Sequence, residues 1–293
     1  MGATVGLAGA GRLAADYAPA LACCSNLGFA GLWSRSPDAT RDLAERFSVP
    51  AFGHFVEMLE HCDAVVFAVP PAAQSALAVI AAGRHKAVLL SRPIAGDLAG
   101  AEELAGAVAA AHAVSQVALT WRYALPVRAF LSMQIKRTHP LGGTGRLISA
   151  GLAAGAPVPR WRAERGVLMD MGVDVLDLLD TALGHTVAIR AHGDPAGWVG
   201  LLLEHEGGRY SEASLCATGS ADEPVRAEIE VFGPGGSAMI DCAEVTGPEA
   251  FQTMVTEFAD AVEHRTPNGP DVRYGLHLQR LLDAAETDLL AGR

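Results

Sequence analysis

Lysine is nearly absent from this sequence of 293 residues. Of its 22 basic residues only Lys86 and Lys136 are lysines, and the others are arginines. Acidic residues outnumber basic ones by 33 to 22, for a formal net charge of −11, so the sequence offers no basic face of the kind that nucleic-acid binding requires. Any chemistry that depends on an ammonium group therefore has two candidates, and we expect no nucleic-acid partner.

Long apolar runs and paired cysteines are also missing. No stretch of about 18 uninterrupted apolar residues occurs, so we expect no membrane span. The first residues, Met1 to Val5, lack the basic and apolar regions of a secretory leader. The five cysteines form no CxxC pair and the ten histidines form no HxxxH pair, which favours free thiols in a reducing compartment and no metal site. We therefore predict a cytoplasmic protein.

Apolar residues make up 50% of the sequence, and a chain of this length, at about 100–200 residues per domain, has room for two domains. In the first 120 residues, short apolar segments alternate with helical patterns. This alternation predicts right-handed crossovers and a doubly wound parallel sheet of the Rossmann type. The expected strands are 4–8, 29–33, 64–69, 87–90 and 115–120, and the expected helices are 14–27, 38–47, 73–82 and 98–112.

The first expected strand ends in Gly9-Ala10-Gly11-Arg12-Leu13-Ala14, a GxGxxA pattern between a strand and a helix. Gly9 permits a tight turn, Gly11 lets the backbone approach a pyrophosphate, and Ala14 keeps the helix close to the strand. The amino terminus of the helix then faces the anion. The loop from Gly9 to Leu13 is therefore predicted to bind a dinucleotide; the alternative is a tight turn that holds no ligand.

The second expected strand ends at Trp33-Ser34-Arg35, where enzymes that use NAD usually carry an acidic residue for the ribose 2′-hydroxyl. Ser34 removes the repulsion that a carboxylate exerts on a 2′-phosphate, and Arg35 can bind that phosphate. This pair favours NADP(H) over NAD(H) as the cofactor, with a solvated loop arginine as the alternative.

Further segments of the chain, in order and spacing, resemble the glucose–fructose oxidoreductase and inositol dehydrogenase (Gfo/Idh/MocA) family. After the glycine motif these are SRSPDATRDLAERFSVPAF, DAVVFAVPPAAQSALAVIAAGRHKAVLLSRPIAG, RGVLMDMGVDVLDLLDTALG and VRAEIEVFGPGGSAMID. The resemblance implies an oxidoreductase with a nicotinamide cofactor. It also implies that the cofactor lies beside a set of residues that follow the strands, namely Val69, Pro70, Gln74, Arg92 and Arg122.

Three family motifs are altered. Where members of the family carry Glu-Lys-Pro, this sequence has Ser91-Arg92-Pro93. The family pattern Asp-x-Gly-x-His-x-x-Asp is changed so that Asp174, between Asp170 and Asp177, stands in the position of the histidine. A histidine that the family carries after the strand 64–69 is Gln74 here. Neither lysine replaces the missing one, because Lys86 precedes the strand 87–90 and Lys136 falls on a helical stretch expected at the surface.

The replacements suggest specific roles. Arg92 cannot donate a proton in catalysis, but it can polarise a carbonyl, bind a carboxylate or orient the nicotinamide amide. Asp174 can act as general acid or base if its surroundings bring its pKa toward neutrality. Alternatively, Arg92 and Asp174 form a purely structural ion pair. Tyr123 is a further proton donor or a packing residue, and the other candidates, catalytic or substrate-binding, are Asp170, Arg122 and Arg162.

The second half of the chain changes to consecutive strands separated by glycine turns, which predicts a mainly antiparallel sheet. The expected strands are 187–191, 198–205, 209–217, 226–232 and 238–241, accompanied by helices at 172–183, 251–264 and 272–290. We therefore expect a Rossmann domain over 1–120 and an α+β domain over 121–293, whose last helix packs back on the first. The resemblance implies a homodimer or homotetramer formed through the second sheet.

Together these features predict an NADP(H)-dependent oxidoreductase that transfers hydride to or from a carbonyl, alcohol or imine carbon of a small polar substrate, such as a sugar or cyclitol. Because two catalytic residues of the family are replaced, a second hypothesis is an NADP(H)-binding sensor without redox turnover. A third is a reaction without net redox change, such as an elimination.

Overall fold

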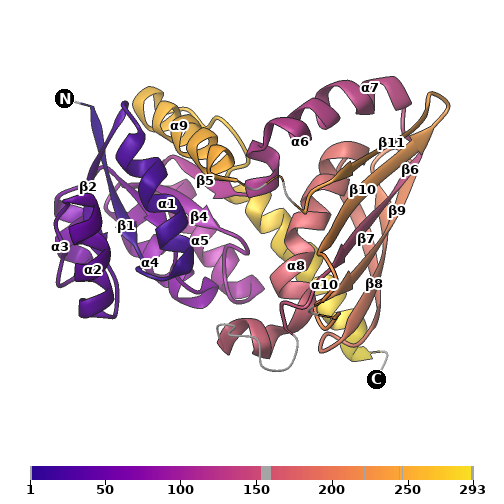
Figure 1. The fold of residues 1–293 in the computed structure, drawn as a ribbon, viewed down its shortest axis with the longest axis horizontal. Helices are drawn as coiled ribbons and strands as arrows, with labels where there is room; N and C mark the ends of the chain where they lie inside the picture. The colour runs from indigo at the N-terminus through magenta and orange to yellow at the C-terminus, as the bar shows by residue number, and fades with distance from the viewer. Residues whose placement is uncertain (1, 153–159, 221, 244, 246, 292–293) are drawn as a thin grey trace. The chain divides into compact units, whose positions relative to one another are not determined.

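The computed structural model describes residues 2–152, 160–220, 222–243, 245 and 247–291. Contacts within the chain divide it into two units (Figure 1). The first consists of Met1–Thr120 with Pro248–His277, and the second of Trp121–Gly247 with Leu278–Arg293. The segment 248–277, which the sequence placed in the second domain, belongs to the first unit.

The first unit contains a five-stranded parallel sheet in the order β2-β1-β3-β4-β5, so the Rossmann prediction is confirmed. Its strands are β1 Ala3–Ala8, β2 Leu27–Trp33, β3 Ala64–Phe67, β4 Ala87–Ser91 and β5 Ser115–Ala118. The helices between them are α1 Arg12–Cys23, α2 Pro37–Phe47, α3 Phe55–Glu60, α4 Pro71–Gly83 and α5 Leu98–Ala111. Only the six-residue α3 has no counterpart in the sequence prediction.

The strand order reverses between β1 and β3, and this reversal determines where a ligand can bind. The chain leaves β1 to form β2 on one side, then returns to β3 on the other side of β1. In open parallel sheets, ligands bind at the carboxyl ends of the strands next to such a switch point. The glycine loop follows the carboxyl end of β1 and therefore lies at this point.

Helix α9, Pro248–His264, completes the first unit, although the sequence analysis assigned it to the second. It packs against α1 and β1 (Figure 1). The rings of Tyr17 and Phe251 meet edge to face at 5.2 Å, and Gln116 of β5 donates a hydrogen bond of 3.1 Å to the carbonyl of Met254. An amphipathic pattern shows that a helix has a buried face but does not identify the sheet that buries it.

The second unit begins with short helical segments and contains a six-stranded sheet in the order β11-β10-β6-β9-β8-β7. The helical segments are a 3-10 turn Thr120–Tyr123, α6 Leu125–Ala129, a π-helical turn Phe130–Gln134 and α7 Ile135–Thr138. The strands are β6 Gly142–Ile148, β7 Thr186–Gly193, β8 Trp198–His205, β9 Arg209–Cys216, β10 Arg226–Gly233 and β11 Gly236–Asp241. The helices that accompany them are α8 Arg160–Leu183 and the carboxyl-terminal part of α10 Val272–Ala291.

Strand β6 was not predicted, and it pairs in parallel with β9 and antiparallel with β10 near the middle of the sheet. Its sequence GGTGRLI is poor in the residues that favour strands. Gly145 is needed because α8 lies very close: a Cβ there would come within 2.5 Å of Cγ1 of Val175. A Cβ on Gly142 or Gly143 would instead crowd the neighbouring strands first. The sheet is therefore mainly, but not entirely, antiparallel.

Helix α8 covers the inner face of this sheet and is bent at Gly166, whose φ of 70° interrupts the helix. The strands β8, β9 and β10 alternate buried and more exposed positions, with the apolar inner side chains packed against α8. Among the described helices, none combines the length and the apolar character needed to cross a membrane.

Candidate nucleotide-binding and catalytic site

The turn after β1 can only be made by glycine. Gly9 has a φ of 128°, and a Cβ at this position would overlap the carbonyl oxygen of Ala68, which follows β3. Its N–H donates a hydrogen bond of 2.7 Å to the carbonyl of Trp33 at the end of β2. Gly9 therefore holds the ends of three strands together and directs the chain into α1.

Gly11 is the amino-terminal cap of α1 and has a different role. No heavy atom lies within 4 Å of the position that a Cβ would occupy. The first turn of α1 carries no acidic residue, and Arg12 and Leu13 are exposed beside it, with Ala10 half-buried. An open helix amino terminus without a negative charge is a good site for an anion, so the loop fits the pyrophosphate of a dinucleotide.

The loop after β2 lacks the carboxylate that binds a ribose 2′-hydroxyl. The hydroxyl of Ser34 lies 2.6 Å from that of Thr40 and accepts a hydrogen bond of 3.1 Å from the N–H of Ser36, so it stabilises the start of α2. Arg35 is exposed, and it makes no ion pair with any other described residue. Arg35 is therefore the group of this loop that can bind a ligand.

Arg92 follows the last residue of β4 and is half-buried, in a loop that begins with a cis bond to Pro93. Val69 and Pro70, predicted beside the cofactor, are half-buried in the turn between β3 and α4. Gln74 is fully buried in the first turn of α4, and its amide binds the backbone of the Arg92 loop. This geometry gives Gln74 no exposed surface for a cofactor, in contrast to the role expected from the sequence.

Tyr17 was missed by the sequence analysis. It lies in α1, is 1% exposed, and makes a hydrogen bond with Ser91, the residue before Arg92. Burial raises the pKa of its hydroxyl, while the bond with Ser91 and the positive charge of Arg92 act in the opposite direction. The nearest signal in the sequence was the position of Tyr17 on the inner face of the helix that follows the glycine loop.

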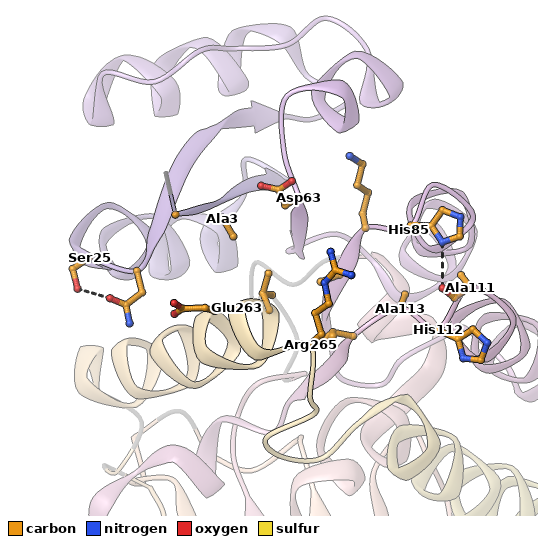
Figure 2. A pocket seen from close by; sticks show the side chains of 15 residues that line it. Ala3, Ser25, Asp63, His85, Ala111, His112, Ala113, Glu263 and Arg265 are labelled. Atoms are coloured by element: carbon orange, nitrogen blue, oxygen red, sulfur yellow. Dashed lines mark hydrogen bonds between the residues drawn. The ribbon is translucent and has the colours of Figure 1, made fainter.

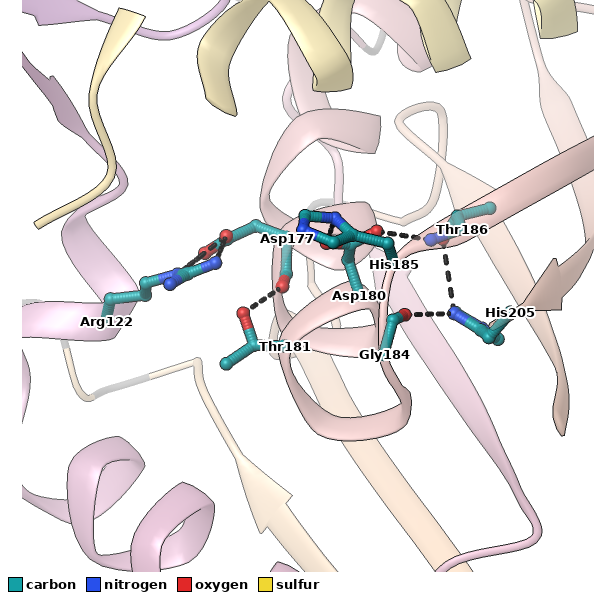
Figure 3. A network of polar contacts seen from close by, with 8 residues as sticks. All are labelled: Arg122, Asp177, Asp180, Thr181, Gly184, His185, Thr186 and His205. Carbon is teal, nitrogen blue, oxygen red and sulfur yellow. Dashed lines mark hydrogen bonds and ion pairs between the residues drawn. The ribbon is translucent and has the colours of Figure 1, made fainter. Parts of the chain in front are cut away.

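In the second unit, α8 carries four buried aspartates, Asp170, Asp174, Asp177 and Asp180. Arg122 donates from Nε to both carboxylate oxygens of Asp177, at 2.7 and 2.9 Å (Figure 3). Nε of Arg162 lies 3.0 Å from Oδ1 of Asp170, so this predicted substrate-binding arginine has a partner within its own unit. Arg165, upstream in the same helix, pairs instead with Glu286.

Asp180 ends this row of acids and supports the sheet. It accepts a hydrogen bond of 2.7 Å from the N–H of Thr186 and lies 3.2 Å from Nδ1 of His185 (Figure 3). Nearby, His205 is buried between the carbonyl of Gly184 and the hydroxyl of Ser211, at 2.8 and 2.7 Å. Burial lowers the pKa of His205 and keeps its ring neutral, so this group is a structural element of the second unit.

Arg122 and Tyr123 occupy the 3-10 turn that begins the second unit. Tyr123 is buried, and the guanidinium of Arg128 lies 5.4 Å from the centre of its ring. The guanidinium of Arg122 is already bound to Asp177, and its backbone carbonyl accepts a 2.9 Å hydrogen bond from Arg128. Arg122, predicted to bind cofactor and substrate, therefore has a structural partner within its own unit.

Comparison with known proteins agrees with this geometry. Residues 3–119 match the GFO_IDH_MocA family model, described as an oxidoreductase family with an NAD-binding Rossmann fold. The amino-terminal domain belongs to the Gfo/Idh/MocA oxidoreductase family. No curated protein sequence matches the chain.

Solved structures share the fold over the whole chain. UDP-N-acetylglucosamine 3-dehydrogenase from Acidithiobacillus ferrooxidans is 18% identical, with a TM-score of 0.86 and coverage of 99% of both chains. A putative myo-inositol dehydrogenase from Sinorhizobium meliloti is 20% identical, with a TM-score of 0.84 over 99% of this chain and 98% of the other. An Agrobacterium radiobacter oxidoreductase, solved with NAD+, L-tartaric acid and magnesium, is 19% identical, with a TM-score of 0.85 over 100% and 98%.

Both lysines lie away from the nucleotide loop. Lys86 precedes β4 and lines a cavity of about 820 Å³ at the amino ends of the strands, opposite to the end that carries Gly9 and Gly11. Figure 2 shows His85, His112 and Arg265 around the same cavity. Lys136 lies exposed on α7 of the second unit. Arg92, by contrast, follows the carboxyl end of β4, on the side of the sheet that carries the nucleotide loop.

Asp174, expected from the resemblance to replace a histidine, has Cys242 as one of its neighbours. The thiol is buried, and its pKa is raised to about 12, first by burial and then by the negative charges of Asp241 and Asp174. Cys242 therefore stays protonated at neutral pH. Nothing in the sequence pointed to Cys242, which lies 68 residues after Asp174.

The two glycines of the nucleotide loop make a direct test. Gly11→Ala is expected to leave the melting temperature within about 2 °C, since the added methyl group meets no protein atom. The same methyl group enters the space assigned to the pyrophosphate, so the dissociation constant for NADPH or NADH, from quenching of tryptophan fluorescence, rises by about tenfold or more. Gly9→Ala, as a control, lowers the melting temperature because of its positive φ and its overlap with Ala68. Unchanged cofactor affinity in Gly11→Ala would contradict the assignment of this loop.

Proposed function

We propose that this protein is an NADP(H)-dependent oxidoreductase. It transfers hydride to or from a carbonyl, alcohol or imine carbon of a small polar substrate, such as a sugar or cyclitol. The observation that carries the proposal is the open, acid-free amino terminus of α1 at Gly11, in a domain that matches an NAD-binding oxidoreductase family. When bound, the nicotinamide supplies or accepts the hydride.

Arg92 and Asp174 are the proposed catalytic residues. Arg92 polarises a carbonyl oxygen or orients the nicotinamide amide, because a guanidinium stays charged and offers a planar set of donors. Asp174, in α8, takes or gives the proton of the substrate oxygen or nitrogen, with Tyr123 as the other candidate for this step. Asp170 and Arg162, which form a 3.0 Å ion pair, are the proposed substrate-binding residues of the second unit.

Preference for NADP(H) is supported by the loop after β2. Its serine hydroxyl is used inside the loop, and the exposed Arg35 can pair with a 2′-phosphate. The Agrobacterium radiobacter structure contains NAD+. The proposed preference of the present chain for NADP(H) therefore rests on its own loop after β2 and not on the cofactor of that structure.

Removal of the positive charge of Arg35 tests the cofactor preference. Arg35→Ala is expected to weaken NADPH binding by roughly 10- to 100-fold, the value of one charge-assisted contact to phosphate, and to leave NADH binding within about twofold. Arg41→Ala, which removes an exposed arginine paired with Asp38 on α2, is the control. Dissociation constants for both cofactors measure the effect, and an unchanged NADPH-to-NADH ratio in Arg35→Ala would rule out this role.

Single-turnover kinetics test the catalytic roles. NADPH oxidation is followed against a panel of keto-sugars, inosose-type cyclitol ketones and imines. Arg92→Ala and Asp174→Asn are expected to lower the rate of the hydride step by about 100-fold or more while NADPH affinity changes by less than about threefold. Arg84→Ala, at an exposed position after α4, is the control.

The outcomes separate the three hypotheses for this chain. Normal rates in both variants would remove Arg92 and Asp174 from the mechanism. NADPH binding without oxidation by any member of the panel would favour the sensor hypothesis, which the two replaced family residues motivate. Product formation without a change in NADPH absorbance would favour an elimination.

We further propose that two copies of the chain associate through the outer face of the second sheet, in the cytoplasm. Supporting features are large apolar side chains at outward positions and five free thiols suited to a reducing compartment. The pairing register places these side chains on one face: Trp198 and Leu202 on β8, Tyr210 on β9, Phe232 on β10 and Met239 on β11.

The association is tested by light scattering during size-exclusion chromatography. Leu202, 57% exposed on β8, is changed to glutamate, which is expected to convert the dimer or tetramer to a smaller species because a charge is buried without a partner. Leu125→Glu is the matched control, since Leu125 is 67% exposed but lies on α6. A monomeric wild-type protein, or the same shift in both variants, would contradict the proposal.

A further inference from the structure

The loop that carries Arg92 has no regular secondary structure. Residues 92–97 form neither helix nor strand, and Pro93 has no N–H to donate. A loop with buried backbone needs other hydrogen-bond partners, because unpaired buried N–H and C=O groups are costly. The partners that hold this loop therefore determine where the Arg92 side chain begins.

Gln74 supplies four of these hydrogen bonds from the first turn of α4. Its Oε1 accepts from the N–H of Ser91 at 2.8 Å, and its Nε2 donates to the carbonyls of Ser91 and Ile94 at 2.8 and 2.9 Å and, over a longer 3.4 Å, to that of Pro93. The side chain is 0% exposed. One amide thus binds the backbone on both sides of Arg92.

The chemistry of the position matches glutamine closely. At its closest contacts the loop presents one N–H and the carbonyl oxygens of Ser91 and Ile94. An amide offers one acceptor and two donors in the same plane. A carboxylate has no donor, and a neutral imidazole has only one. The length of the side chain also matters, because it extends from α4 to the backbone at the end of β4.

Ser91 is fixed from two further sides. Its hydroxyl donates a 2.6 Å hydrogen bond to the carbonyl of Phe67 at the end of β3, and the buried Tyr17 of α1 bonds to Ser91 as well. These contacts secure the residue before Arg92, whereas Gln74 also binds the two residues after it, at the carbonyls of Pro93 and Ile94. Gln74 is therefore the contact that spans the loop.

We propose that Gln74 is a positioning residue that holds the loop 91–94 and thereby sets the place and direction of the Arg92 guanidinium. The proposal rests on the catalytic role assigned to Arg92 above. An arginine side chain has many rotamers, so its effect on a reacting group depends on a fixed backbone origin. A displacement of about 1 Å at a reacting centre can lower a rate by 100-fold.

The test compares two buried glutamines of the same sheet. Gln74→Leu removes all four hydrogen bonds at similar volume, and Gln116→Leu removes a glutamine of β5 that is 1% exposed and binds Met254 instead. Gln74→Leu is expected to lower kcat by about 100-fold with NADPH affinity within about threefold. Gln116→Leu keeps kcat within about threefold, even where both variants lose a similar amount in melting temperature.

A double mutant shows whether the effect passes through Arg92. In an Arg92→Ala background, Gln74→Leu is expected to lower kcat by less than about threefold further, because the group that it positions is gone. An additional loss as large as in the wild type would overturn the proposal, and so would equal losses of kcat in Gln74→Leu and Gln116→Leu.

Hydrogen exchange gives a readout that needs neither cofactor nor activity. The N–H of Ser91 is bonded to Gln74, so Gln74→Leu is expected to accelerate exchange in peptides that cover 88–96, and Gln116→Leu is not. Unchanged exchange there would show that the loop does not depend on Gln74. Faster exchange in Gln74→Leu together with full activity in Arg92→Ala would show that Gln74 holds the loop but that Arg92 is not catalytic. Failure of the proposal for Gln74 and failure of the proposed role of Arg92 are therefore distinguishable.

Discussion

Backbone atoms of Gly9 and Ala68 approach so closely that no side chain fits between them. This contact lies where the order of the parallel sheet reverses, and the N–H of Gly9 is bonded to the end of β2 at the same time. The ends of β1, β2 and β3 are thereby fixed relative to one another. The direction of α1, the open space at Gly11 and the positions of the two following loops all depend on this turn.

The ends of β3 and β4 extend this arrangement with side chains in place of backbone. Ser91 bonds to Phe67, and Gln74 bonds to the backbone on either side of Arg92. The nucleotide loop is fixed by close backbone contacts that only glycine allows, whereas the Arg92 loop is fixed by the side-chain amide of Gln74. In both cases irregular backbone at the carboxyl ends of buried strands is held by hydrogen bonds.

Buried charge organises the second unit. Four aspartates on one helix are stable only if each is compensated, since an ion left buried without its partner costs about 3–5 kcal/mol. Arg122 compensates Asp177, Arg162 pairs with Asp170, and Asp180 binds the backbone at Thr186. Two arginines that the sequence analysis assigned to ligands thus have partners in their own unit. The charge of Asp174 in turn contributes to the high pKa of the Cys242 thiol.

Much of the fold could be predicted because it leaves local signals. Strands β3 and β4 are continuous apolar runs, and the GxGxxA motif marks the turn after β1. Strand β6 could not be predicted, because its glycines lower strand propensity and are required by the close approach of α8 and of the neighbouring strands, which the local sequence does not reveal. Nor could the partner of α9, because its buried face is equally suited to either sheet.

The candidate site, like the fold, was predicted only in part from the sequence. The sequence by itself determined the residue types: glycines for the nucleotide loop, Ser34 and Arg35 without a carboxylate, and Arg92 and Asp174 where lysine and histidine were expected. Only the tertiary structure decided that Gln74 faces the Arg92 loop, that Asp177 binds Arg122, and that Tyr17 lies beside Ser91. The reason is physical. A local pattern depends on neighbours in the chain, whereas these contacts join residues 17 to 74 positions apart.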